Sequence, residues 1–66
     1  MSDATILRDT VGAAEIVTQQ APEGDRWMSV VRGGAWDGYV SVMDLAGSAE
    51  ALHAQVLADV KAAPNG

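Results

Sequence analysis

The fold is decided by the stretch 26–44, which reads RWMSVVR over 26–32, GGAWDG over 33–38 and YVSVMD over 39–44. Valine, tryptophan and tyrosine are enriched in strands, and both flanking segments are rich in them. The glycines between the segments allow the positive φ angles that tight chain reversals need. The stretch therefore predicts a β-hairpin.

The residues before this hairpin fit an amphipathic helix over 3–20. At 100° per residue, one arc of the helical wheel collects the apolar side chains Ile6, Leu7, Val11, Ala13, Ala14 and Val17. A strand at 15–20 is the alternative, because the run Ile16-Val17-Thr18 is β-branched and Gly12 costs about 1 kcal/mol inside a helix. Pro22-Glu23-Gly24-Asp25 predicts a turn after this segment.

A second helix is expected at about 48–63. Ser48 is a suitable N-cap, and Glu50 places negative charge at the positive end of the helix dipole. One mainly apolar stripe comprises Ala49, Leu52, His53, Val56, Leu57, Val60 and Ala63. We therefore expect one small α+β domain over 1–66, of order α-β-β-α, with two helices packed on a central antiparallel hairpin. A β-β-β-α meander with a C-terminal helix is the alternative.

Both faces of the predicted hairpin are apolar. Because side chains alternate along a strand, one face carries Met28, Val30, Val40 and Val42, and the other carries Trp27, Val31, Tyr39 and Met43. Helices on one side would leave the other face in water, and exposed apolar patches usually mark interaction sites. The expected partner-binding residues, including an aromatic at the loop tip, are Trp27, Val31, Trp36, Tyr39 and Met43. If the helices straddle the hairpin, both faces belong to the core.

The composition of the chain argues against several classes of protein and of binding partner. The chain has 66 residues, no cysteine, one histidine and a formal net charge of −5. It can build neither a disulfide nor the usual zinc sites alone, and we expect no metal or cofactor. Its charge argues against direct binding to nucleic acid or an anionic membrane. No apolar run approaches the roughly 20 residues of a membrane span, and the first residues lack a basic signal region, so a soluble cytoplasmic protein is expected.

Candidate catalytic groups are few, and each has a structural explanation. His53 lies in the apolar stripe of the second helix, where a packed histidine is expected. The serines are strand or cap residues, namely Ser29, Ser41 and Ser48, and the aspartates flanking the strands are turn residues, namely Asp25, Asp37 and Asp44. The glycines of the hairpin lack the spacing of a phosphate-binding loop. We therefore expect no enzymatic activity.

The segment Gly38–Gly47 resembles the strand and Asp-Leu-Pro-Gly corner of HicB-type antitoxins, with Ala46 in place of the proline. The resemblance covers about ten residues and implies an antitoxin-like regulator as one alternative. The whole chain favours a non-catalytic interaction module, such as a small regulator, adaptor or assembly subunit, that forms a homodimer through the hairpin face or binds another protein with a basic surface. An acidic inhibitor from a phage or mobile element, directed at a nucleic-acid-processing protein, is the other alternative.

Overall fold

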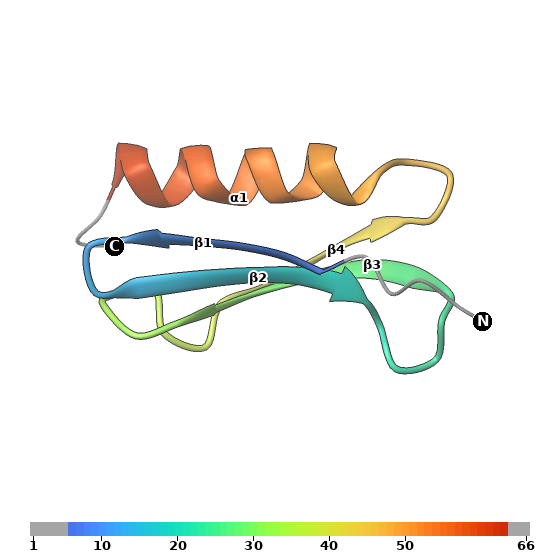
Figure 1. The fold of residues 1–66 in the computed structure, drawn as a ribbon, viewed down its shortest axis with the longest axis horizontal. Coiled ribbons are helices and arrows are strands. Elements are labelled where there is room, and N and C mark those ends of the chain that lie inside the picture. Colours follow the sequence, from blue (N-terminus) through green and yellow to red (C-terminus); the bar gives the residue numbers. More distant parts are fainter. Residues whose placement is uncertain (1–5, 64–66) are drawn as a thin grey trace.

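Four antiparallel strands and one helix make up the structure, a computed structural model that describes residues 6–63 (Figure 1). The sheet is a meander, because its strand order is β1-β2-β3-β4. The elements are β1 (Leu7–Val11), β2 (Ala14–Gln20), β3 (Arg26–Arg32), β4 (Val40–Asp44) and α1 (Ala49–Ala62). The predicted α+β class, the hairpin over 26–44 and the C-terminal helix are confirmed.

The predicted N-terminal helix over 3–20 is wrong, although its residues 3–5 lie outside the described part of the chain. In its place, β1 and β2 form a hairpin with Gly12 and Ala13 at the turn. Gly12 has a φ of 57° and Ala13 a negative φ, which is the φ pattern of the type II′ turns that suit strand twist. The alternative β-β-β-α meander describes the architecture better, with one strand too few.

The physical reason for this correction is the pairing of β2 with β3. Six residue pairs join the two strands, from Glu15 opposite Arg32 to Gln20 opposite Trp27. The β-branched run at 16–18 lies in the middle of β2, where it packs well on a pleated surface. An isolated two-stranded hairpin is marginal in water, and two further strands give α1 a wider surface to cover.

The helix α1 begins where the sequence indicates. Ser48 is the N-cap, and its Oγ accepts a hydrogen bond of 3.0 Å from the backbone N–H of Ala51. Glu50 lies in the first turn and Lys61 in the last, which is the favourable arrangement with the helix dipole. At the other end, Nε1 of Trp36 donates a hydrogen bond of 2.6 Å to the carbonyl oxygen of Ala63. This bond connects the β3–β4 loop to the end of the helix.

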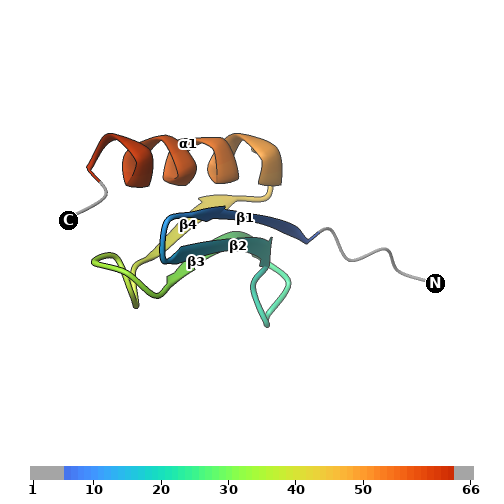
Figure 2. The same cartoon turned by 60° about the vertical axis from the view of Figure 1, so that its left-hand side comes forward.

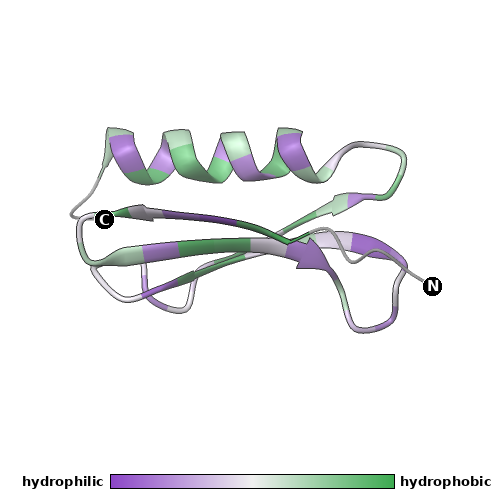
Figure 3. Cartoon of the chain, viewed as in Figure 1, coloured by the Kyte–Doolittle hydropathy of each residue, from purple (hydrophilic) through white to green (hydrophobic). Residues whose placement is uncertain are grey.

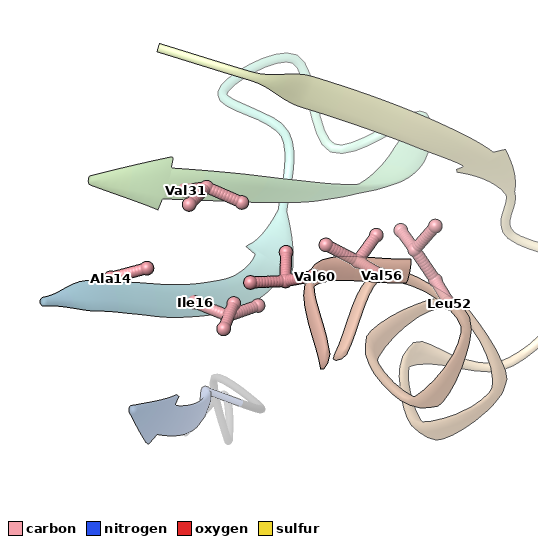
Figure 4. Close-up of a cluster of buried hydrophobic side chains, with 6 residues drawn as sticks. All are labelled: Ala14, Ile16, Val31, Leu52, Val56 and Val60. Carbon is pink, nitrogen blue, oxygen red and sulfur yellow. The ribbon is translucent and has the colours of Figure 1, made fainter. Parts of the chain in front are cut away.

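The core lies between α1 and one face of the sheet. Figures 1 and 2 both place α1 on this side of the sheet, and no element among residues 6–63 covers the opposite face. Apolar and polar segments alternate along α1 and the strands (Figure 3), as expected for elements with one buried side. The buried cluster is shown in Figure 4 and comprises Ala14, Ile16, Val31, Leu52, Val56 and Val60.

The close approach of two turns at Gly33 gives a first testable prediction. Gly33 has a φ of 82°, and a Cβ at this position would collide with the carbonyl oxygen of Ala13. Gly33→Ala is therefore expected to lower the free energy of unfolding by about 2 kcal/mol, from left-handed strain and backbone displacement. Gly12→Ala is the matched control, because its φ is also positive but a Cβ there meets nothing within 4 Å. Urea unfolding of both variants measures the difference, and equal costs would contradict the described approach.

Candidate functional site

The face of the sheet that points away from α1 carries a continuous group of apolar side chains. Ser29 and Val31 of β3 are buried beneath α1, so the alternate residues of β3 and their cross-strand neighbours lie on the other face. We call this group the outer patch, and it consists of Val17, Met28, Val30, Val40 and Val42. Val40 and Val42 are each 51% exposed, and the other three are half-buried. No element among residues 6–63 covers the outer patch.

Charged side chains flank the outer patch at one end, which we call the basic end. Glu15 and Arg32 are cross-strand neighbours at this end, and Arg8 lies beside Val17 on the edge strand β1. Arg8 and Glu15 form a salt bridge of 3.5 Å between neighbouring strands. These side chains line a depression of about 190 Å³ together with apolar and amide groups from β2 and β3.

The opposite end, which we call the acidic end, has two aspartates and one arginine. Asp44 of β4 is the cross-strand neighbour of Arg26, but Arg26 forms its salt bridge of 3.1 Å with Asp25. The hydrogen bonds from Arg26 lower the pKa of the Asp25 carboxyl below its usual 3.8, and Asp25 raises the pKa of the Arg26 guanidinium in turn. Because the pKa of Asp25 is lowered on folding, the stabilisation by this exposed pair is present at neutral pH and is lost only as the pH falls through the lowered value.

The predicted partner-binding residues divide into two groups in the structure. Trp27, Val31 and Met43 lie on the face that α1 covers; Val31 is fully buried, and Trp27 and Met43 pack against the core. Trp36 and Tyr39 lie in the β3–β4 loop, with ring centroids 5.0 Å apart in an edge-to-face arrangement. The structure thus does not join the five residues in one surface, and their contact with a partner stays a prediction.

The β3–β4 loop has a shallow pocket of its own. This pocket has a volume of about 380 Å³ and is lined by Ala35, Trp36, Asp37, Gly38 and Tyr39. The Trp36 indole is held by its hydrogen bond to Ala63, and a carboxylate oxygen of Asp37 accepts a hydrogen bond of 2.7 Å from the backbone N–H of Gly33. These bonds fix the loop, so Trp36 contributes to the fold rather than extending freely from the tip.

A chain of polar side chains crosses the interface between the sheet and α1. His53 Nε2 lies 2.6 Å from Oδ2 of Asp9, His53 Nδ1 lies 2.7 Å from Oγ1 of Thr18, and Thr18 Oγ1 shares a hydrogen bond of 2.9 Å with Oγ of Ser29. The order carboxylate, imidazole, hydroxyl is that of a hydrolase triad. However, Thr18 and Ser29 are fully buried, so a substrate cannot reach either hydroxyl in this structure. The role of these four side chains is to give one another's buried polar atoms hydrogen-bond partners.

Within the described part of the chain, no group of three or more histidine, cysteine, aspartate or glutamate residues is placed to hold a metal ion. Between residues 6 and 63, no helix has the length and apolar character needed to cross a membrane.

Comparisons with known proteins do not identify a relative of this chain. No protein-family model, no curated protein and no solved structure matches the chain. The candidate site therefore depends on the outer patch and its charged ends alone.

Proposed function

We propose that this chain is a non-catalytic protein–protein interaction module that forms a homodimer through the outer patch. The observation that supports the proposal is the exposure of Val40 and Val42, each 51%, beside three further apolar side chains on a sheet face that no element among residues 6–63 covers. Exposed apolar patches with charged residues around them are typical of surfaces that bind other proteins. Each Å² removed from water contributes about 25 cal/mol, so covering the patch is favourable.

A second copy suits this surface because sheet faces stack well on each other. Two sheets pack about 10 Å apart with their strands aligned to within about 30°, and side chains from the inner faces interdigitate. Such a dimer has four layers, with a helix on each outer side and two sheets between them. The patch is small for a protein interface, so a modest affinity in the micromolar range is expected.

The proposal predicts that a charge within the outer patch separates the subunits. Light scattering coupled to size-exclusion chromatography, from about 10 µM to about 1 mM, is expected to give a rising mass for the unsubstituted chain and a constant monomer mass for Val42→Lys. The reason is that a lysine ammonium would have to be desolvated between the two sheets.

The matched control is Leu45→Lys, because Leu45 is also an exposed apolar residue, at 37%, but lies in the turn after β4. This variant is expected to dimerise like the unsubstituted chain. A monomeric unsubstituted chain across the whole range, or a dimer that persists in Val42→Lys, would disprove the proposed function.

A further inference from the structure

The sheet has two edge strands, β1 and β4, and they differ in how they are protected. In β1, Arg8 and Asp9 are charged, and charged side chains on an edge discourage the addition of a further strand. In β4, residues 40–43 are uncharged and contain no proline. Among residues 6–63, no strand pairs with the outer side of β4. β4 is therefore the edge to which a further strand adds more easily.

The exposed apolar side chains of the protein gather at the same strand. In the described part of the chain five large apolar residues are exposed, and four of them lie in β4 or directly beside its ends. These four are Tyr39, Val40, Val42 and Leu45. An added strand would pack its own side chains against such residues, as neighbouring strands of a sheet do.

The hydrogen bonds between β3 and β4 follow a fixed alternation. The N–H of Val31 donates to the carbonyl oxygen of Tyr39, which makes these two residues a hydrogen-bonded pair. Hydrogen-bonded and non-hydrogen-bonded pairs alternate along an antiparallel ladder. In the register of β3 with β4, the next hydrogen-bonded residues of β4 are therefore Ser41 and Met43.

The remaining backbone groups of β4 point out of the sheet at its edge. They are the N–H and C=O of Val40 and Val42 and the N–H of Asp44. The C=O of Asp44 is not among them, because it accepts a hydrogen bond of 2.9 Å from the N–H of Gly47. Alternating donors and acceptors in one row are what an extended backbone can satisfy.

A cleft lies at the Asp44 end of this edge. It has a volume of about 260 Å³ and is lined by Asp25, Arg26, Val42, Met43 and Asp44. Two carboxylates against one guanidinium give the cleft a net negative charge, and Arg26 is already paired with Asp25. The apolar lining suits the methylene stem of an arginine, and the carboxylates suit its guanidinium. A second copy of β4 offers no such group, because residues 39–45 contain no basic residue.

We propose that β4 is the docking site for an extended, basic segment of another protein, which adds an antiparallel strand to the sheet. Antiparallel pairing is the arrangement of every strand pair in this sheet, and it is slightly more stable per residue than parallel pairing. The proposal does not rest on the homodimer through the outer patch. The edge groups point along the plane of the sheet, so they stay accessible when two sheets stack face to face.

The register of the edge specifies the docking sequence. In an antiparallel strand, the residue opposite Asp44 comes first and is basic, so that its side chain enters the cleft. The residues opposite Val42 and Val40 follow at the second and fourth positions after it, and they are apolar because they lie on the same face as these valines. The expected pattern is therefore basic-x-apolar-x-apolar.

The test uses the acetylated and amidated peptide RTVTVT, which has this pattern. NMR titration of the chain at about 50 µM is expected to show saturable binding below about 1 mM. N-methylation of the first valine removes an N–H that points toward β4, so the dissociation constant should rise at least about tenfold. N-methylation of the first threonine is the matched control, because its N–H points away from β4, and it should leave binding unchanged. Neither change affects the folding of the chain.

Amide hydrogen exchange checks the register. In the chain alone, the N–H of Val42 should exchange faster than those of Ser41 and Met43, which bond to β3. With about 90% of the chain bound to RTVTVT, exchange at Val40 and Val42 should slow by about tenfold. Exchange at Ser41 and Met43 should change little.

The basic residue is tested by a double comparison. QTVTVT is expected to bind about threefold more weakly than RTVTVT at about 50 mM salt, and the difference should shrink at about 500 mM. In Asp44→Asn the two peptides should bind alike. Oδ1 of Asp44 accepts a hydrogen bond of 2.9 Å from the N–H of Ala46, and asparagine keeps such an acceptor, so this variant should remain folded.

Three outcomes would overturn the proposal. RTVTVT that does not bind at about 5 mM, or whose two N-methylated forms bind equally, excludes strand addition at β4. Equal binding of RTVTVT and QTVTVT excludes a basic segment as the partner. Protection of the Val42 N–H that rises as the chain alone is concentrated to about 1 mM would place a second copy at this edge. The homodimer through the outer patch is decided separately, by light scattering of Val42→Lys.

Discussion

Replacement of Leu52 by alanine is expected to leave most of the protein unfolded at 37 °C. Leu52 is 1% exposed and belongs to the cluster that joins α1 to β2 and β3. Burial at such a site makes Leu→Ala cost about 3–5 kcal/mol, through lost transfer free energy and a residual cavity. A domain below 70 residues has a total stability of only about 3–5 kcal/mol, so this one change is comparable to the whole.

The matched control for this prediction is Leu57→Ala. Leu57 lies on the same helix but is only partly buried at the edge of the core, so the same chemical change should cost about 1–2 kcal/mol. Both variants are compared by urea unfolding at about 5 µM, because the proposed dimer would add stability to the folded state at higher concentration. A Leu52→Ala variant as stable as Leu57→Ala would mean that α1 does not pack on the sheet as described.

The hairpin over 26–44 and the helix α1 could be predicted because their signals are local. A glycine-rich segment between two β-rich segments predicts a reversal without reference to the rest of the chain. The N-cap Ser48 and the apolar stripe after it likewise act within one element. In contrast, β1 and β2 have apolar positions that fit a helical period as well as a strand. Their state is decided by the pairing of β2 with β3, which is a tertiary interaction that local propensity does not report.

The exposed face of the sheet could not be predicted because it depends on the number of helices. Sequence alternation sorted the residues of β3 and β4 into two apolar faces, and both sets are reproduced by the structure except for Tyr39, which lies in the loop before β4. Within residues 6–63, α1 is the one helix, and it covers one face. One sequence feature indicates which face α1 covers. Thr18 and Ser29 need hydrogen-bond partners when they are buried, and α1 brings His53 to the face on which they lie.

Replacement of Thr18 by valine is expected to lower the free energy of unfolding by about 3 kcal/mol, although the two side chains have the same shape. The Thr18 hydroxyl is the contact of both His53 Nδ1, at 2.7 Å, and Ser29 Oγ, at 2.9 Å. Valine leaves two buried polar atoms without that contact, and each loss costs about 1–3 kcal/mol. Thr18→Ser keeps the hydroxyl and removes one methyl group, so it should cost only about 1 kcal/mol.

The decisive comparison is a triple variant in which Thr18→Val is combined with Ser29→Ala and His53→Leu. Removing all the buried partners together leaves no unsatisfied group, and Asp9 is hydrated because its side chain is 52% exposed. The triple variant should therefore be more stable than Thr18→Val alone and lie within about 1 kcal/mol of the unsubstituted chain. Urea unfolding of Thr18→Val, Ser29→Ala, His53→Leu and the triple variant gives the coupling between the three sites. Losses that simply add would show that the polar chain from Asp9 to Ser29 is not a connected network, and that α1 is held on the sheet by its apolar contacts alone.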